Sequence, residues 1–283
     1  MNKQRITVYT PESSIAHPLK MVRDMWADIF SGRGLALSLA IRDIKAQYRQ
    51  TFLGIIWALI LPLISTVTWI FLNLSGIVSV SATELPYPVY VLTGTMIWAI
   101  FMEALNAPLA QTTAAKHMLA KINFPREALI MSGISKILFN SSIKIGLIIV
   151  VLLVFGIYPD WHLILFPCAL ISLIMVGTMI GLLFTPIGLL YTDVGNGIRL
   201  VMQFLMYVSP VVFPVPTAGW VATIFELNPL TPLILTARDW LTGMPTEYLW
   251  PFLAINLSCF LVLLVVGVIY RLAMPIMIER MGS

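Results

Sequence analysis

Charged and polar side chains interrupt two of the most apolar stretches of the chain. Lys136, Asn140 and Lys144 follow one another at intervals of four residues, so a helix places them on one face. Glu103 is the clear acidic residue within an apolar stretch. A charge isolated at the middle of a bilayer costs at least about 2.5–3.5 kcal/mol, so each of these charged groups should meet a partner or water.

Two interpretations of these four residues remain open. In the first, Glu103 and Lys136 lie at similar depths on neighbouring antiparallel helices and form an ion pair, and the polar face lines a conduit or holds two copies of the chain together. In the second, Lys136 extends its ammonium group toward the nearer membrane surface, and Lys144 meets a local polar partner. Both predict a polar face on the helix that carries the two lysines.

The motifs of hydrolysis and phosphate binding are missing from the sequence. It contains no G-x-x-x-x-G-K-[ST], no G-x-S-x-G, no H-E-x-x-H and no cluster of Cys and His with metal-ligand spacing. A proton-driven carrier usually needs a relay of buried carboxylates or histidines, and this chain offers at most one such carboxylate. We therefore expect no catalytic residue, no metal and no cofactor in this chain, and an energy source in another subunit.

The elements that must hold these side chains are membrane helices. The chain has 283 residues, of which 59% are hydrophobic and 11% charged, whereas soluble domains carry about 25% charge. A membrane span needs roughly 20 apolar residues. Six segments approach that length: 52–76, 89–112, 128–157, 163–190, 198–213 and 251–270. Because a helix satisfies its own backbone groups in lipid, the predicted fold is an all-α integral membrane protein with six transmembrane helices.

The distribution of Lys and Arg predicts the orientation of the six helices. Residues 1–51 alone carry eight of the 17 basic side chains, and most of the others fall in loops on the same side. Arg238 is the single basic residue on the opposite side. The positive-inside rule then places both termini in the cytoplasm. The positive-inside distribution accounts for the net charge of +4, so this charge does not indicate a nucleic-acid partner, and we expect none.

We divide the chain into a cytoplasmic N-terminal arm, residues 1–51, and a membrane domain, residues 52–283. Within the arm, segment 34–50 carries an apolar arc beside a basic arc when its residues are placed on a helix. The apolar arc is Leu37, Ile41, Ile44 and Tyr48, and the basic arc is Arg42, Lys45 and Arg49. This pattern predicts an amphipathic helix at the membrane interface. A solvated helix beside the membrane is the alternative.

Loop 113–127, between the second and third segments, is short, polar and basic. Leu119 and Ile122 are spaced as one helical face, with Lys116 and Lys121 at its rim. Pro125 disfavours helix at Phe124 and suits the first turn of the next span. We predict a short helix lying across the membrane surface, and an ordinary basic loop is the alternative.

Segment 214–250 is too apolar for a free loop and too interrupted by proline for a plain span. Two short helices that dip back into the membrane would reconcile these properties, provided that protein or a wet cavity surrounds them. Its polar side chains include Glu226, Asn228 and Arg238. Since Arg238 is the lone basic residue on its side, it should have an acidic partner. Glu226 is the first choice and Asp239 the second.

Four blocks of sequence, in order, resemble the permease subunits of ABC-type polysaccharide exporters. They are RDIKAQYRQTFLGIIWALILPL (42–63), INFPREAL (122–129), YTDVGNGIRLVMQFLMYVSPVVFP (191–214) and NPLTPLI (228–234). Within that family the long N-terminal arm and the first block are most similar to exporters of O-antigen or related lipid-linked glycans. The third block departs from the usual YRDVR, so no role of a basic residue carries over to Thr192 or Gly195.

The resemblance implies a homodimer of this chain with two separate ATPase subunits, which would bind ATP and Mg, in a bacterial inner membrane. It implies that helix 34–50 and loop 113–127 form the surface against which the ATPases press. The predicted coupling residues are Arg42, Lys45, Arg49, Lys116, Leu119, Lys121 and Ile122. Anionic lipid is an alternative partner for the first three. Segment 214–250 would form two gate helices near the outer face, with Glu226, Asn228 and Arg238 as gate residues.

A lipid-linked sugar polymer needs contacts that are weak and repeated, such as stacking on aromatic faces. We predict that aromatic residues near the ends of the first, fourth and fifth segments line its path: Tyr48, Phe52, Tyr191, Phe204 and Tyr207. Aromatic anchors at the membrane interface are the alternative. For the whole chain, a membrane-embedded transferase acting on lipid-linked sugars and a stand-alone secondary carrier are the competing functions. Co-purification with an ATPase discriminates among the three.

Overall fold

The computed structural model describes residues 18–49, 52–78, 80, 83–121 and 124–282. This part of the chain is helical and contains no strand. In chain order its helices are α2 (Pro18–Arg49), η1 (Gly54–Ile56), α3 (Trp57–Leu74), α4 (Tyr87–Ala114), α5 (Lys116–Lys121), α6 (Glu127–Val154), η2 (Trp161–Ile164), α7 (Phe166–Leu190), α8 (Thr192–Tyr207), α9 (Trp220–Leu227), α10 (Leu230–Thr242) and α11 (Leu249–Gly282).

Helix α4 forms the centre of the bundle, with α6 and α7 packed along it and α3 beside it. In its most apolar stretch 78% of the residues are buried within the chain, against 11% in the corresponding stretches of α3 and α11. The exposed side chains of α3 and α11 are nevertheless large and apolar. Water is a poor solvent for such surfaces, so lipid or another apolar protein surface must cover them. The chain is an integral membrane protein.

Five helices of the described chain are long and apolar enough to cross a membrane, and they confirm five of the six predicted segments. The segment predicted at 198–213 is different. It falls on α8, which has 16 residues, and on the non-helical turn that follows. The sixth candidate is instead the pair α9 and α10, which are bent by 78° and form either a broken span or a re-entrant loop. The two short helices predicted within 214–250 are therefore present.

The N-terminal helix is longer than predicted, because it begins at Pro18 rather than near residue 34. Its inward face carries Gly32, Ala36, Leu39 and Ala40, which are buried where α2 crosses α6. These mostly small side chains allow close approach, and a Cβ on Gly32 would lie 3.3 Å from the Cβ of Ala128. Two residues of the predicted apolar arc, Leu37 and Ile41, are exposed and remain available to an interface, whereas Ile44 and Tyr48 are half-buried.

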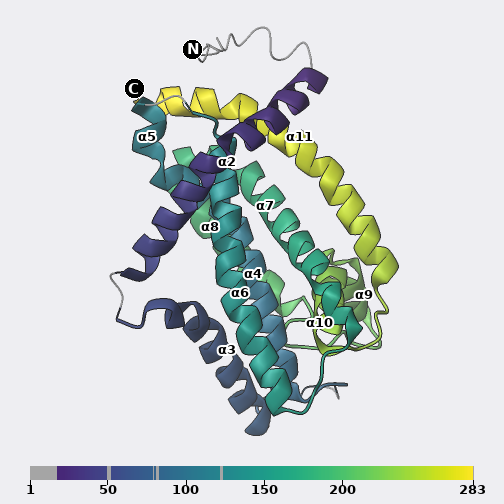
Figure 1. The fold of residues 1–283 in the computed structure, drawn as a ribbon. Coiled ribbons are helices and arrows are strands. Elements are labelled where there is room, and N and C mark those ends of the chain that lie inside the picture. The colour runs from purple at the N-terminus through teal and green to yellow at the C-terminus, as the bar shows by residue number, and fades with distance from the viewer. Residues whose placement is uncertain (1–17, 50–51, 79, 81–82, 122–123, 283) are drawn as a thin grey trace.

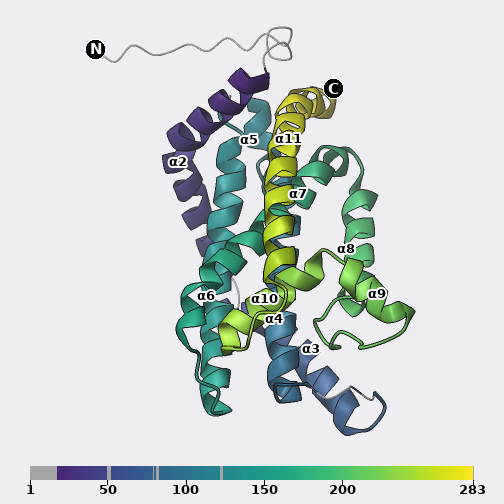
Figure 2. The same ribbon diagram turned by 90° about the vertical axis from the view of Figure 1, so that its right-hand side faces the viewer.

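An ion-pair cluster joins α2 to the other helices that end near it. Arg271 of α11 bonds Asp28 of α2 at 2.6 Å and Glu127, in the first turn of α6, at 3.0 Å. The start of α2, the short helix α5 and the end of α11 lie at one end of the molecule (Figure 1). Helices α9 and α10 lie toward the other end (Figure 2). We call these the terminal end and the gate-segment end.

The contact between α7 and α4 depends on glycines that allow the two backbones to touch. A Cβ added to Gly181 would lie 2.2 Å from the carbonyl oxygen of Leu105, and one on Gly177 would lie 2.7 Å from the Cβ of Ala104. The two glycines are four residues apart, so they face α4 together. This is the small-residue packing by which membrane helices associate without a hydrophobic driving force.

Candidate functional site

Two of the three polar residues predicted on α6, Asn140 and Lys144, lie in one network at the crossing of α2, α4 and α6, and Lys136 does not take part in it. The ammonium group of Lys144 forms an ion pair with the carboxylate of Glu103. The side-chain amide of Asn140 donates to the same carboxylate at 3.3 Å, and the Tyr48 hydroxyl donates to the Asn140 carbonyl oxygen at 2.7 Å. Lys144 is 1% exposed and Glu103 is 32% exposed. Three helices therefore share one polar contact.

Of the two interpretations, the one that paired Glu103 with Lys136 was wrong, because the carboxylate pairs with Lys144. The other interpretation expected Lys144 to meet a local polar partner, and Glu103 is that partner. The reason is the direction of side chains on a helix. Each Cα–Cβ bond leans toward the helix N-terminus, so a long lysine covers the turn before its own Cα. Lys144 therefore reaches back to the level of Asn140, where both groups meet Glu103. Counting Cα positions alone placed the ammonium group of Lys144 too far along α6 to reach Glu103.

Tyr48 is the residue of α2 that joins this network, through its hydrogen bond to Asn140. It is half-buried, its ring lies 6.3 Å from that of Phe139, and burial together with the nearby Glu103 carboxylate raises the pKa of its hydroxyl. It is therefore a neutral hydrogen-bond donor at physiological pH. Tyr48 was predicted to line the glycan path, and that role remains a prediction, but the structure gives it a positioning contact that the sequence did not indicate.

The other aromatic residues predicted for the path are exposed. These are Phe52, Tyr191, Phe204 and Tyr207. The structure brings Tyr207 next to Trp69 of α3, with ring centroids 6.0 Å apart, and Trp69 also meets Phe213 at 5.3 Å. Trp69 was not singled out from the sequence. Its position in the middle of an apolar run gave no signal that it would join α8 to α3.

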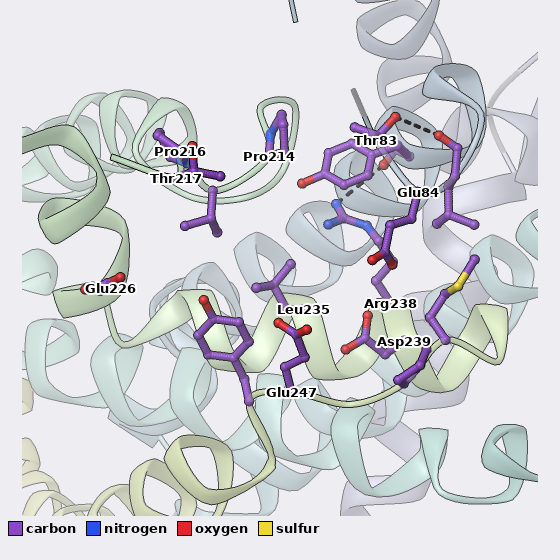
Figure 3. A pocket seen from close by; sticks show the side chains of 16 residues that line it. Thr83, Glu84, Pro214, Pro216, Thr217, Glu226, Leu235, Arg238, Asp239 and Glu247 are labelled. Atoms are coloured by element: carbon purple, nitrogen blue, oxygen red, sulfur yellow. Dashed lines mark hydrogen bonds between the residues drawn. The ribbon is translucent and has the colours of Figure 1, made fainter. Parts of the chain in front are cut away.

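A pocket of about 470 Å³ opens at the gate-segment end, between α10, the turn at 214–217 and the loop before α4 (Figure 3). Four of its polar lining residues are acidic: Glu84, Glu226, Asp239 and Glu247. Arg238 is its basic residue, and Tyr90 and Tyr248 also line it. In Figure 3, Glu84, Asp239 and Glu247 gather around Arg238 and Leu235, and Glu226 lies apart on α9.

Arg238 forms neither of the predicted ion pairs, with Glu226 as the first choice or with Asp239 as the second. Its guanidinium donates to three backbone carbonyls and one hydroxyl: Pro210 at 2.7 Å, Val211 at 3.3 Å, Tyr90 at 3.4 Å and the Thr93 hydroxyl at 3.2 Å. It also lies over the Tyr90 ring, 3.7 Å from the centroid. The prediction considered acidic partners only. The carbonyls of the irregular turn at 208–213 and of the start of α4 satisfy the cation instead.

Asn228 occupies the break between α9 and α10. Its side-chain amide donates to the Val208 carbonyl at 2.9 Å and to the Ser209 hydroxyl at 2.8 Å, and its carbonyl oxygen accepts from the Leu230 backbone N–H at 2.9 Å. Asn228 thus ties the bend of the gate segment to the turn after α8. Its predicted place in a gate remains a prediction, and the structure shows a residue that fixes the bend.

Six of the seven predicted coupling residues lie on α2 and α5. Arg42, Lys45, Arg49 and Lys116 are exposed, and Arg42 pairs with the adjacent Asp43 at 2.8 Å. Leu119 is half-buried and packs against two apolar clusters of this same chain, one that contains Leu39 and one that contains Met274. Lys121 ends α5, but its side chain, like the whole of Ile122, lies outside the described residues. The short helix predicted in this loop is present.

The described part of the chain contains no group of three or more His, Cys, Asp and Glu side chains that could hold a metal ion. What the chain offers is a buried polar network near the N-terminal helix, exposed basic residues on α2 and α5, and an acidic pocket at the gate-segment end. This arrangement suits binding, coupling and passage across a membrane.

Comparison with known proteins agrees with this character. A model of the ABC-2 type transporter family matches residues 35–242. An O-antigen export system permease protein from Myxococcus xanthus is 23% identical over 220 residues, covering 76% of this chain and 82% of that protein. Two permease proteins of the same description from Klebsiella pneumoniae are 23% and 22% identical over 214 residues, each covering 72% of this chain and 79% of its own.

Proposed function

Because this chain belongs to the ABC-2 type transporter family, we propose that it is the permease subunit of an exporter of a lipid-linked, O-antigen-like polysaccharide. The observation that carries the substrate class is that three curated relatives, each aligned over most of its length, are named O-antigen export permeases. The family itself accounts for the missing phosphate-binding motif, since its members are transport subunits that work with ABC ATPase subunits.

The assembly we propose contains two copies of this chain and two ATPase subunits in a bacterial inner membrane, with both termini in the cytoplasm. The exposed apolar faces of α3 and α8 support a second copy, because large apolar side chains such as Phe71, Val201 and Phe204 lie open on them. The excess of Lys and Arg in residues 1–51 supports the orientation. In this orientation α5 faces the ATPases, and the gate segment faces outward.

Deletion of the gene tests the proposed function. We expect the surface polysaccharide to disappear while full-length glycan, still attached to its lipid, accumulates inside the cell. Expression of the chain from a plasmid should restore the surface polysaccharide. A transferase would leave a different result, because its loss would leave a shortened or unmodified glycan. Normal surface polysaccharide in the deletion strain would refute the proposal.

A crosslinking prediction tests which end of the molecule meets the ATPase. In a chain whose Cys168 and Cys259 are changed to alanine, we expect Lys116→Cys, once labelled with a maleimide that carries a photoreactive benzophenone, to crosslink to the ATPase subunit on irradiation, because the benzophenone inserts into C–H bonds and needs no cysteine on the ATPase. Lys116 is exposed at the terminal end, where the short helix α5 presents it. The product would be measured in membranes by immunoblotting for both subunits.

The matched control is Thr223→Cys, an exposed position on α9 in the gate segment. It should give no product with the ATPase. Lys116 is preferred over Leu119 because Leu119 packs inside this chain, so its substitution would disturb the fold as well as a docking contact. Crosslinking through position 223 and not through 116 would show that the orientation is reversed.

A further inference from the structure

The carboxylates of the acidic pocket have no partner within the part of the chain that the structure describes. No hydrogen bond or ion pair engages the side-chain carboxylates of Glu84, Glu226, Asp239 and Glu247, although Arg238, Glu84 and Glu247 are electrostatic neighbours of Asp239. Packing several acidic groups around one pocket raises their mutual repulsion. The pocket therefore keeps an excess of strong hydrogen-bond acceptors that the chain itself does not use.

Arg238 adds an unused donor to the same pocket. Its residue is 2% exposed, and the contacts to Pro210, Val211 and Tyr90 hold its guanidinium in one position. Its Nη1 atom is buried and has no hydrogen-bond partner among the described residues. A buried guanidinium nitrogen without a hydrogen-bond partner is costly, and Arg238 lines the pocket, so a hydroxyl that entered the pocket and accepted from this nitrogen would relieve that cost. Figure 3 shows this side chain above Leu235 and beside Glu84, facing the hollow.

The chemistry of the lining selects among ligands. A metal ion does not fit, because the carboxylates are not grouped closely enough to hold one. An anionic ligand would meet four carboxylates and one cation, so the net potential repels it. A ligand rich in hydroxyl groups suits both halves of the lining, since each hydroxyl donates to a carboxylate and accepts from a guanidinium. Tyr90 and Tyr248 add aromatic surface to the same hollow.

We propose that this pocket binds one or a few sugar units of the exported glycan as it leaves the gate segment, and that it favours neutral or amino sugars over acidic ones. The volume of about 470 Å³ lies in the range of roughly 300–1,000 Å³ that small-ligand sites span. The proposal rests on the proposed function and adds to it a place and a charge preference. It involves this chain alone and needs no ATPase residue.

Photocrosslinking in living cells tests the pocket with the natural glycan as the probe. Leu235 lines the pocket and is half-buried, so the photoreactive residue p-benzoylphenylalanine at this position should capture a passing sugar chain. We expect irradiation of exporting cells to convert part of the tagged permease to a slowly migrating, glycan-staining adduct. The same residue at Leu253, exposed on the outer face of α11 and outside the pocket, should give none.

Removing the negative charge from two of the acceptors should weaken capture without changing the shape of the pocket. Asp239→Asn with Glu247→Gln is expected to lower the yield of the adduct about tenfold, the factor expected from a lost charge-assisted hydrogen bond. Should the residue at Leu235 prevent folding, p-benzoylphenylalanine at Tyr248 replaces it, because that position is already aromatic. The yield is measured against the amount of folded, tagged permease in the membrane.

The possible results separate this inference from the proposed function. An adduct at position 235 or 248 that the carboxamide variant weakens supports the pocket. If export proceeds normally without an adduct at either position, the pocket is not on the path, and the export function stands. If the carboxamide variant captures as much glycan as the parent, the carboxylates do not recognise it. If the unmodified chain exports no glycan, the proposed function itself fails.

Discussion

Replacing Lys144 with methionine is expected to lower the free energy of unfolding by about 3 kcal/mol and to abolish most export. Lys144 is 1% exposed, and its ammonium group is the cation that balances Glu103. Removing one member of a buried ion pair leaves the other charge uncompensated, which costs more than the pair contributes. Two quantities are measured. Tryptophan fluorescence monitors the thermal midpoint of the purified permease in detergent, and the amount of surface polysaccharide reports export.

Two further variants test this prediction: Lys136→Met is a control, and Glu103→Gln combined with Lys144→Met should restore stability. Lys136→Met removes a lysine from the same helix that makes no ion pair within the described chain, so its effect should be small. Adding Glu103→Gln to Lys144→Met should recover much of the loss, because the neutral amide can still accept from Asn140. A double variant no more stable than Lys144→Met alone would show that the pair does not carry the effect.

Gly181→Ala is expected to destabilise the bundle by about 3 kcal/mol, although alanine is the better helix former. The new methyl group would lie 2.2 Å from the Leu105 carbonyl oxygen and 3.0 Å from the ring of Pro108. Backbone atoms cannot rotate aside, so α7 and α4 would have to separate along a contact that both bury. We expect little folded protein in membranes and a large fall in the thermal midpoint of what remains.

Gly146→Ala is the matched control, since it places the same methyl group on another membrane helix with no atom within 4 Å. It should leave stability unchanged or raise it slightly. Equal behaviour of the two alanine variants would mean that α4 and α7 are not held by backbone contact at Gly181.

The apolar helices could be predicted from sequence because their signal is a long uninterrupted run, as in α4, α6 and α7. The segment at 198–213 failed for a physical reason. Its apolar run begins inside α8, which is amphipathic, and ends in a turn where Pro210 and Pro214 interrupt the backbone. The average hydrophobicity of residues 198–213 reports neither the amphipathic character of α8 nor the turn that follows it. The break between α9 and α10 was predictable because five prolines, including Pro229 at the break, lie in the otherwise apolar segment 214–250.

Partners across the fold were harder to predict than the elements that carry them. The polar face of α6 was read from its four-residue period, but the choice of Lys144 depends on which way lysine leans. Arg238 binds carbonyls of an irregular turn, whose position no periodicity reports. Arg271 meets Asp28 only because α2 extends back to Pro18, and that extension has no apolar run to mark it.

The two attachments of α2 have a mechanical consequence. Asp28 is tied to Arg271 near its start, and Tyr48 is tied to Asn140 near its finish, 20 residues later. At 1.5 Å per residue the anchors stand about 30 Å apart on one rod. Because a helix resists stretching, α2 cannot slide along its axis without breaking one tie or carrying both partners with it. A force on the exposed basic residues of α2 would therefore be transmitted along this helix to the Glu103–Lys144 pair. It would reach α4 and α6 without passing through α5.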